Sequence, residues 1–516
     1  MQFYPTLPEV LQLAERHSFI PISCTVWNDY LTPILLFQQI KGEYSFLLES
    51  VEGGEKWAKY SFIGNNPFLV FSVREGKAYV EHVREKERVI EPLSGHPLKH
   101  LKQLLQSYQI PEGLDLPRFA GGAIGYIGYD AISLVADIPG HKEHPLKQDQ
   151  IRLMFCDNII AYNHLKQEIT FITYLHLSPG ATELEIKEEY RKKQEELSLR
   201  INSMFRSIEQ DQFQLLSKPE VSTEQLWANV ASNMEKESFL ASVEKVKEYI
   251  RLGETAQTVL SQRFSRKINT DPFNIYRVLR SINPSPYLYY LDLGDNYTIV
   301  GSSPERLVQL EDGRVETNPI AGTRPRGKTE AEDQALAEEL LADAKEISEH
   351  KMLVQLGIED ISRIAKPGTV KVSKEMEIQR FSHVMHLVST VEGELKEGYD
   401  AVDCLFSCFP AGTVSGTPKQ RAMEIIAELE KEARHAYAGA IGYFSFSGNM
   451  DTCITIRTII IDQQTAYVQA GAGIVEDSVP EKEWQETRNK AQAMLLAIQL
   501  AEQIFMSRDE EETIHV

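Results

Sequence analysis

Four glutamates have the spacing that most directly suggests chemistry. Glu346 and Glu349 lie three positions apart in a segment predicted to be helical, and Glu483 and Glu486 repeat that spacing nearer the C-terminus, with Lys490 four residues further on. Residues three or four positions apart share one face of a helix. A set of carboxylates without histidine or cysteine suits a hard cation such as Mg²⁺. Water molecules and substrate oxygens then complete the coordination shell of the cation. The alternative is two solvated helix faces, because glutamate pairs are common there.

A glycine-containing segment lies just before the second glutamate pair. Residues Gln469 to Val475 read QAGAGIV, and Gly471, Ala472 and Gly473 leave backbone N–H groups accessible to a carboxylate or a phosphate. The alternative interpretation is a tight turn between a strand and a helix. Residues 412 to 419 read GTVSGTPK but lack the Gly-Lys-Ser/Thr ending of a P-loop, so ATP binding is not expected there.

Two further side chains could bind substrate or transfer protons. Arg457 lies in the run TCITIRTIII, which predicts a strand in which the arginine shares a face with Thr455 and Cys453. An arginine in an apolar strand requires a carboxylate partner, either from a substrate or from the protein. His386 shares a strand face with two valines, so it is either a proton-transfer group or a hydrogen-bonded core histidine.

The predicted elements alternate irregularly, which indicates the α+β class. Strands are expected at 60–73, 78–83, 258–264, 287–293, 297–301, 381–391 and 452–461, a hairpin at 159–174, and helices at 181–208, 235–252 and 329–365, the last as one or two helices. The sequence GAIGY occurs at 122–126 and again at 439–443, which is either chance or a sign of similar strands in two halves. The polar residues 209–224, with one proline, predict a linker.

Composition excludes several classes of protein. The 516 residues include 54 basic and 75 acidic side chains, a formal net charge of −21, and 42% are hydrophobic. Such a chain is globular rather than disordered, and it lacks the basic surface of a nucleic-acid binder or of a protein docked on anionic lipid. Five cysteines without a CxxC spacing predict reduced thiols. No signal peptide or apolar membrane segment is visible, so we expect a cytoplasmic protein.

The motifs, taken in order, resemble anthranilate synthase component I, of the chorismate-utilising enzymes. They are LLES at 47–50, SPERL at 303–307, NPIAGTRPRG at 318–327, EHKMLV at 349–354 and VMHLVS at 384–389. GTVSGTPK, GAIGYF, CITIRT and AGAGIVEDSVPEKEWQET follow. The resemblance covers about residues 20 to 500. It implies a large, intertwined, two-part β-sandwich-like core with surrounding helices.

The resemblance also implies an activity. Ammonia would add at ring C2 of chorismate while the C4 hydroxyl leaves, and loss of pyruvate would give anthranilate, the first committed intermediate of tryptophan synthesis. Two positions separate this activity from related ones. Ala321 replaces the nucleophilic lysine of aminodeoxychorismate synthases, and Thr258 replaces the lysine that activates water in isochorismate and salicylate synthases.

Carried over by position, the resemblance assigns a role to each site residue. Glu349 and Glu486 would bind Mg²⁺, and Glu346 and Glu483 would support its water shell. Glu305 would protonate the leaving hydroxyl and His386 would transfer protons near C2. The residues expected to bind or position the substrate are Thr323, Thr413, Tyr443, Arg457, Gly471, Ala472, Gly473 and Lys490.

Regulation and a partner are implied as well. Glu49, Ser50, Pro284, Tyr287 and Leu288 resemble a tryptophan feedback pocket, which predicts a regulatory domain at 1–208, a catalytic domain at 225–505 and an acidic tail at 506–516. No Cys-His-Glu set indicates a glutaminase, so ammonia from glutamine would require a separate amidotransferase subunit, component II.

Two segments depart from the family pattern. Glu254-Thr255-Ala256 replaces Asp-Ile-Phe, and residues 355–359 lack an Asp and an Arg-Asn pair found in the family. Two alternatives stay open, and these changes motivate the second. One is an enzyme that stops at aminodeoxyisochorismate, without losing pyruvate. The other is a catalytically weakened subunit that senses tryptophan.

Overall fold

The computed structural model describes residues 1–50, 59–85, 88–140, 146, 148–210, 225–381 and 384–514. Most of the predicted linker, residues 211–224, therefore lies outside the described part, and residues 209–210 end helix α4 (Glu183–Gln210). Within the described residues, no helix is both long enough and apolar enough to cross a membrane.

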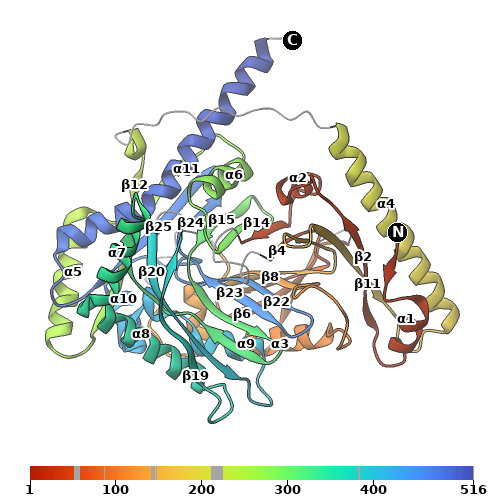
Figure 1. Cartoon of the computed structure of the whole chain (residues 1–516), viewed down its shortest axis with the longest axis horizontal. Coiled ribbons are helices and arrows are strands. Elements are labelled where there is room, and N and C mark those ends of the chain that lie inside the picture. The colour runs from red at the N-terminus through yellow and green to blue at the C-terminus, as the bar shows by residue number, and fades with distance from the viewer. Residues whose placement is uncertain are drawn as a thin grey trace.

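Two large antiparallel sheets form the body of the protein (Figure 1). The first sheet has thirteen strands, in the spatial order β1 (Phe3–Tyr4), β2 (Phe19–Trp27), β11 (Glu168–His176), β10 (Ile159–Asn163), β4 (Tyr60–Asn65), β3 (Ser45–Glu49), β14 (Tyr287–Asp292), β15 (Tyr297–Ser303), β24 (Thr458–Asp462), β25 (Thr465–Ile474), β13 (Gln257–Lys267) and β12 (Ala231–Ser232), with β21 (Gly416–Thr417) also on β13.

The second sheet has twelve strands. Their order is β18 (Ile320–Pro325), β20 (Val384–Glu394), β17 (Arg314–Thr317), β16 (Arg306–Glu311), β23 (Met450–Ile454), β22 (Ala440–Ser445), β8 (Gly122–Ile127), β9 (Ile151–Cys156), β5 (Leu69–Arg74), β6 (Lys77–His82) and β7 (Val89–Leu93), with β19 (Lys371–Arg380) also on β20. Each sheet therefore combines strands from both halves of the chain, and the predicted α+β class with an intertwined sandwich is confirmed.

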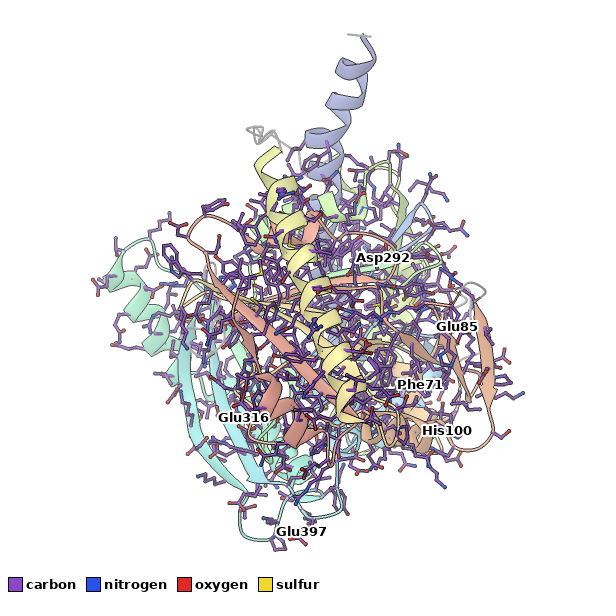
Figure 2. All side chains as sticks on the ribbon, turned by 90° about the vertical axis from the view of Figure 1, so that its right-hand side faces the viewer. Phe71, Glu85, His100, Asp292, Glu316 and Glu397 are labelled. Carbon is purple, nitrogen blue, oxygen red and sulfur yellow. The ribbon has the colours of Figure 1, made fainter. Side chains whose placement is uncertain are left out.

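Helices cover the outer surfaces of the sheets. They are α1 (Leu7–Leu13), α2 (Pro33–Gln38), α3 (Pro97–Ser107), α4, α5 (Lys236–Arg251), α6 (Pro272–Ile282), α7 (Glu330–Ala342), α8 (Ala344–Ser362), α9 (Ala401–Cys408), α10 (Lys419–Leu429) and α11 (Pro480–Ile514), with short 3₁₀ helices η1 (Tyr129–Leu134), η2 (Gln225–Trp227) and η3 (Gly412–Val414). Helices α5, α7, α8 and α10 gather at the end of the molecule opposite α1 and α4 (Figure 1). Seen from that opposite side, α4 lies across the first sheet (Figure 2), where it packs on β2 and β11.

Successive side chains of a strand point to opposite faces of the sheet, so the strands line two separate cores. Strand β14 directs Tyr289 and Leu291 between the sheets, and it directs Leu288 and Tyr290 to the outer face of the first sheet, under α6 and α11. This is the period of two expected for a strand buried on both faces. Because strands from both ends of the chain line both cores, the division into a regulatory and a catalytic domain stays a prediction.

The predicted strand 452–461 is wrong as a single element. It is two strands, β23 in the second sheet and β24 in the first, and the chain crosses between the sheets at residues 455–457. A second crossing, from β15 to β16, places Pro304 and Glu305 beside it. The Ile454 amide donates to the Glu305 carbonyl at 3.0 Å, and the Ser302 amide donates to the Arg457 carbonyl at 3.1 Å. The two crossings are therefore bound to each other.

The repeated GAIGY sequences lie side by side. Strands β8 and β22 pair in the middle of the second sheet, with Gly125 opposite Gly442. The region 329–365 is two helices, α7 and α8, because the Asp343 side chain accepts hydrogen bonds from the first amides of α8 and so begins a new helix. Residues 506–514, predicted to form a tail, continue α11.

Replacing Gly442 tests the central strand pairing. A Cβ at this position would lie 2.0 Å from the Asp451 carbonyl oxygen. We therefore expect Gly442→Ala to lower the free energy of unfolding in urea by about 1–3 kcal/mol. Gly42→Ala is the control, since its Cβ would meet no atom within 4 Å. An unchanged unfolding midpoint for Gly442→Ala would contradict this register.

Candidate functional site

Glu305 is held at a crossing between the sheets, next to η3. Its carboxylate accepts a hydrogen bond from the Thr413 hydroxyl at 3.1 Å. Burial raises the pKa of Glu305 to about 7, although the Thr413 hydroxyl and the positive charges of Lys490 and Arg457 act in the opposite direction. A carboxyl group that is partly protonated at neutral pH can serve as a general acid.

Arg457 lies at the other crossing rather than within a strand. Its φ of 52° is in the left-handed region, which costs a non-glycine residue free energy. Its side chain makes no hydrogen bond or ion pair with the described residues, and burial lowers its pKa, while Tyr437, Glu486 and Glu305 raise it. An internal salt bridge is thus not the explanation for this arginine, and an anionic ligand would provide the missing partner.

The glycines of β25 allow two side chains to pack closely against this strand. Gly471 and Gly473 point to one face of the strand, where a Cβ would lie 2.6 Å from the Tyr437 hydroxyl and 2.5 Å from Gln257 Nε2. Ala472 points to the opposite face and is buried in the core. Only glycine lets the Tyr437 and Gln257 side chains approach this backbone so closely.

Carboxylates from two helices face the same region. The pKa of Glu349 on α8 is raised first by burial and then by the charges of Glu346 and, across the gap between helices, Glu486 on α11. Burial and Glu486 likewise raise the pKa of Glu483. Lys490 links this group to the glycines, since its ammonium lies 2.6 Å from Glu486 Oε1 and donates to the Gly471 carbonyl at 2.9 Å.

The carboxylates do not form a complete metal cage. In the described part of the chain, no three His, Cys, Asp or Glu side chains are grouped as metal ligands. The negative charge of Glu486 raises the pKa of Glu349, and a cation that keeps most of its water, as Mg²⁺ does, still fits these two carboxylates because it would relieve their repulsion. Glu346 is also partly paired, at 3.6 Å from Arg324.

His386 is oriented by its backbone neighbours. Its Nδ1 donates to the Gly322 carbonyl at 2.9 Å and lies 3.1 Å from the Thr323 hydroxyl, so Nδ1 carries the proton and Nε2 is left as the acceptor. Burial, and to a lesser degree Arg457, lowers the His386 pKa. The imidazole is therefore neutral at physiological pH and can accept a proton.

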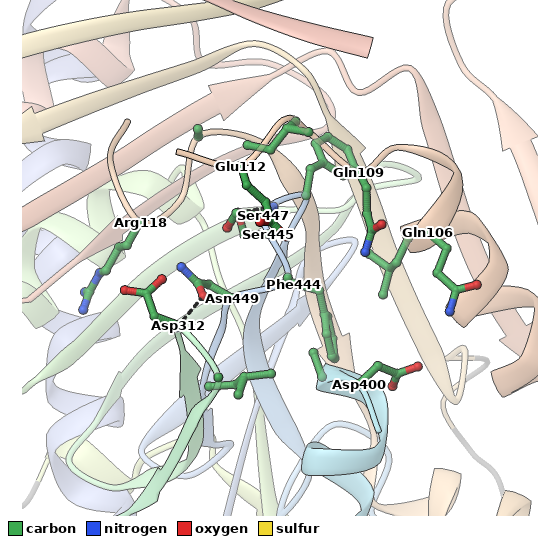
Figure 3. A pocket seen from close by; sticks show the side chains of 18 of the residues that line it. Gln106, Gln109, Glu112, Arg118, Asp312, Asp400, Phe444, Ser445, Ser447 and Asn449 are labelled. Atoms are coloured by element: carbon green, nitrogen blue, oxygen red, sulfur yellow. Dashed lines mark hydrogen bonds between the residues drawn. The ribbon is translucent and has the colours of Figure 1, made fainter. Parts of the chain in front are cut away.

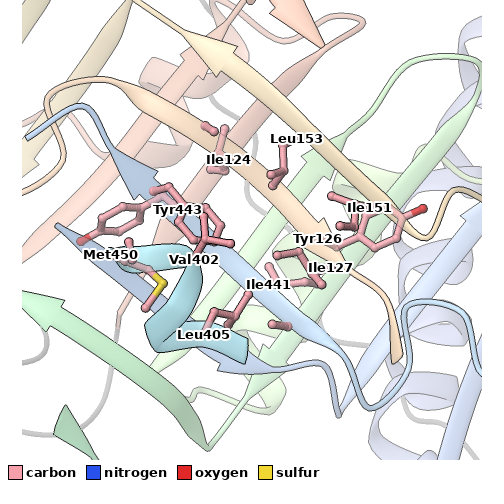
Figure 4. Close-up of a cluster of buried hydrophobic side chains, with 14 of the residues drawn as sticks. Ile124, Tyr126, Ile127, Ile151, Leu153, Val402, Leu405, Ile441, Tyr443 and Met450 are labelled. Atoms are coloured by element: carbon pink, nitrogen blue, oxygen red, sulfur yellow. The ribbon is translucent and has the colours of Figure 1, made fainter. Parts of the chain in front are cut away.

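Tyr443 does not join this cluster. It is buried in the core between the sheets (Figure 4), its ring centroid is 4.4 Å from that of Phe119, and its charged neighbours are Arg118 and Asp451. Tyr437, six residues earlier, is the tyrosine that reaches Arg457 and Gly471. Sequence reasoning missed it because GAIGY drew attention to the later tyrosine, and the segment 434–439 has no strand pattern that would assign a direction to Tyr437.

The residues predicted to form a tryptophan pocket lie on two faces of the first sheet. Glu49 pairs in register with Leu288, and its carboxylate accepts hydrogen bonds from Tyr276 at 2.6 Å and Arg280 at 2.8 Å. Tyr287 points the other way, towards the second sheet, where it donates to Asp451 at 2.9 Å. Ser50 directly follows β3, and Pro284 precedes β14 by three residues. The five residues therefore do not all lie on one face of the sheet.

The segments that depart from the family pattern are exposed only in part, since Thr255 is buried. Gln355 and Glu359 are exposed and hydrogen-bonded to each other at 3.1 Å, and Glu254 pairs with Arg421 at 2.6 Å.

A cavity of about 690 Å³ lies between α3, α9 and the end of β22 (Figure 3). It is separate from the candidate site, because its lining contains none of the predicted catalytic or metal-binding residues.

Comparison with known proteins decides the family. Residues 45–496 match the model of the family described as chorismate binding enzyme. The chain belongs to the chorismate binding enzyme family. It is 48% identical to anthranilate synthase component 1 of Acetivibrio thermocellus, over 97% of this chain and 100% of that protein. The anthranilate synthase component 1 of Aquifex aeolicus is 45% identical, over 96% and 98% of the two chains.

Solved structures agree with this membership. The crystal structure of anthranilate synthase component I from Streptococcus pneumoniae TIGR4 superposes with a TM-score of 0.73 at 38% identity, covering 91% of this chain and 99% of that one. The menaquinone-specific isochorismate synthase of Escherichia coli shares the fold, with a TM-score of 0.68 at 21% identity over 95% and 98% of the two chains. The predicted resemblance to component I of the family is confirmed.

The pKa of Glu305 predicts a dependence of stability on pH. The folded protein keeps this proton up to about pH 7, whereas the unfolded chain releases it near its ordinary value of 4.5. Stability should therefore fall as pH rises through this window, by at most about 1.4 kcal/mol per pH unit. Glu305→Gln removes the effect. In urea unfolding, the free energy of unfolding of this variant, relative to that of the parent, should therefore increase from pH 4.5 to 7.

Thr413→Val is the companion variant. It removes the hydroxyl that lowers the Glu305 pKa, so the upper end of the window should move to higher pH. Parallel stability curves for Glu305→Gln and the parent would show that Glu305 carries no unusual proton.

Proposed function

We propose that this chorismate binding enzyme is the component I of an anthranilate synthase. It converts chorismate and ammonia into anthranilate and pyruvate, the first step of tryptophan biosynthesis. The observation that carries the proposal is the buried Arg457, which pairs with none of the described residues and lies beside Glu305, Tyr437 and the β25 glycines, with two glutamate pairs beyond them. The proposal is supported by 45% and 48% identity, over nearly the full length of the chain, to two proteins named anthranilate synthase component 1.

The two carboxylates of chorismate explain the two ends of the site. Arg457 and the Tyr437 hydroxyl would bind the enolpyruvyl carboxylate, since Arg457 has no partner in the described part of the chain and burial strengthens its attraction for an anion. The ring carboxylate would lie at the other end, near Lys490 and the backbone of Gly471, Ala472 and Gly473. With the carboxylates bound in this way, the ring would lie near Glu305 and His386, both of which are affected by the charge of Arg457.

Mg²⁺ is the expected cofactor. Glu349 and Glu486 would hold it, with Glu346 and Glu483 supporting its water molecules, and it would neutralise the ring carboxylate. The donor set consists of carboxylates from two helices, in which the charge of Glu486 raises the pKa of Glu349 and Glu483, and this set suits a hard cation.

The protein side chains divide the proton transfers. Glu305, with a pKa raised to about 7, would donate its proton to the C4 hydroxyl as that group leaves, and Thr413 would hold the carboxyl in place. Neutral His386 would accept a proton through Nε2, with Thr323 and the Gly322 carbonyl fixing the ring. Ala321 provides no nucleophile, which leaves C2 open to ammonia.

An activity assay separates this function from the two alternatives. The purified protein with chorismate, Mg²⁺ and ammonium should produce fluorescent anthranilate and an equal amount of pyruvate. A non-aromatic amine as the only product would instead indicate an aminodeoxyisochorismate synthase. No product from the folded protein would indicate a weakened, tryptophan-sensing subunit. With glutamine in place of ammonium, we expect activity only after a component II amidotransferase is added.

The metal assignment predicts a loss of function without loss of fold. Glu349→Gln or Glu486→Gln should lower kcat at least about 100-fold at saturating Mg²⁺ and weaken the binding of Mn²⁺ measured by electron paramagnetic resonance. Glu481→Gln is the matched control. Glu481 is exposed, precedes Glu486 by five residues on α11 and lies outside the proposed donor set. Full activity in both Glu349→Gln and Glu486→Gln would refute the assignment.

Feedback inhibition by tryptophan is the second part of the proposal. Around Glu49 and Leu288, on the α6 face of the first sheet, a carboxylate, the Tyr276 hydroxyl and apolar side chains suit an amino acid with an aromatic side chain. Ser50 and Pro284 lie near the ends of the same strands, whereas Tyr287 belongs to the opposite face. A pocket apart from the catalytic groups regulates them only if tryptophan binds two states of the protein unequally. The strands β14 and β15 connect this pocket directly to Glu305.

Ser50→Ala tests this regulation. We expect it to weaken tryptophan inhibition about tenfold or more while kcat without tryptophan stays near that of the parent. Ser107→Ala, at the exposed end of α3, is the control and should keep normal inhibition. If isothermal calorimetry gave the same tryptophan affinity for both variants, the pocket would be misplaced.

A further inference from the structure

A fully buried arginine lies directly behind the proposed catalytic groups. The Arg434 side chain has 0% exposure and its partner Glu430 has 4%. Arg434 Nε and Nη2 donate to the two oxygens of Glu430 at 2.7 and 2.6 Å, Nη1 donates to the Val414 carbonyl at 2.7 Å, and Nη2 also donates to the Val259 carbonyl at 2.7 Å. One guanidinium thus fixes three separate segments of the chain.

Each of these segments borders the proposed site. Val414 follows Thr413, whose hydroxyl donates to Glu305. Val259 lies on β13 directly opposite Gly473 of β25. Glu430 in turn accepts from the amide and hydroxyl of Ser261, which is opposite Gly471. The Arg434–Glu430 ion pair therefore sets the distance between η3, which carries Thr413, and the paired strands β13 and β25, of which β25 carries the glycines.

The same guanidinium also contacts Tyr437. It lies 5.6 Å from the centroid of the Tyr437 ring and 4.8 Å from that of Tyr129. The backbone of Tyr437 is tied to it as well, since the Tyr437 amide donates to the Arg434 carbonyl at 3.1 Å. The hydroxyl at the far end of the ring is the group that reaches Gly471.

We infer that Arg434 is a positioning residue for the active site: it aligns Thr413 and Tyr437 with the β25 glycines without touching the substrate. The inference rests on the proposed function for what these groups bind. Stability alone is a weak reason for such a residue, because a buried ion pair is often no more stabilising than apolar side chains of the same volume. Four hydrogen bonds in fixed directions are what a planar guanidinium supplies and an ammonium cannot.

Arg434→Lys is the main test. Lysine keeps the charge but cannot reach Glu430, Val414 and Val259 together, so we expect kcat to fall about tenfold or more, with a smaller change in KM. The basic limb of the pH–rate profile should move to higher pH, as in Thr413→Val, because the Thr413 hydroxyl lowers the Glu305 pKa and would be displaced. The other charged groups acting on Glu305, Lys490 and Arg457, are unchanged in both variants.

Arg152→Lys is the matched control. Arg152 is also a buried arginine with several partners, since it donates hydrogen bonds to Asp149 at 2.9 Å, Asp295 at 2.9 Å and the Leu293 carbonyl at 3.0 Å, and none of these partners belongs to the proposed site. It should lower stability and leave the pH–rate profile in place. An Arg434→Lys profile that coincides with those of the parent and Arg152→Lys would overturn the inference.

Hydrogen exchange provides a readout that needs no activity. Peptides covering 412–417 and 434–439 should exchange faster in Arg434→Lys than in the parent, and those of β8 should not. If Arg434→Lys does not fold, Glu430→Gln, which leaves both carbonyl contacts but removes the charge that anchors the guanidinium, should give the same pattern. Unchanged exchange in a folded variant would refute the inference, whereas a parent without anthranilate activity would refute only the proposed function.

Discussion

The site depends on two neighbouring segments that pass together from one sheet to the other. Strands β15 and β24 pair in the first sheet, β16 and β23 pair in the second, and reciprocal backbone hydrogen bonds join the two crossings. Backbone that leaves a sheet loses its ladder partners, so each crossing satisfies the other. Glu305 and Arg457 occupy these crossings, and this explains how a carboxyl and a guanidinium are buried next to each other without forming an ion pair.

Burial then sets the chemistry of both groups. Desolvation raises the pKa of Glu305 to about 7, and Arg457 stays charged without an ion-pair partner among the residues that the structure describes. A ligand with two carboxylates would meet Arg457 at one end and Lys490 with the glycines of β25 at the other. The net charge of −21 does not oppose this, because salt screens diffuse charge beyond about 10 Å, whereas the site acts at contact distance.

Much of the architecture follows from local sequence patterns. The period of two along β13, β14 and β15 and the period of 3.6 along α5 gave nearly the observed bounds, because apolar side chains must face a core. The single strand predicted at 452–461 was wrong because Val, Ile and Thr favour extended backbone in either sheet, so their pattern continues across a change of sheet. The tyrosine of the proposed site was missed for a related reason: Tyr437 belongs to an irregular segment, and only its contact with Gly471 assigns it a direction.

The sequence by itself determined the residue types: paired glutamates at helical spacing, glycines at positions two apart, one arginine in an apolar run, and the motifs of a family. These features can be recognised in the sequence because the periods of helices and strands relate residues that are only a few positions apart. Only the tertiary structure decided which of these residues meet. Glu305 and Arg457 are 152 positions apart, Glu349 and Glu486 are 137 apart, and Tyr443 is separated from Arg457 despite its proximity in sequence. Long-range strand pairing decides such distances, and no local pattern encodes it.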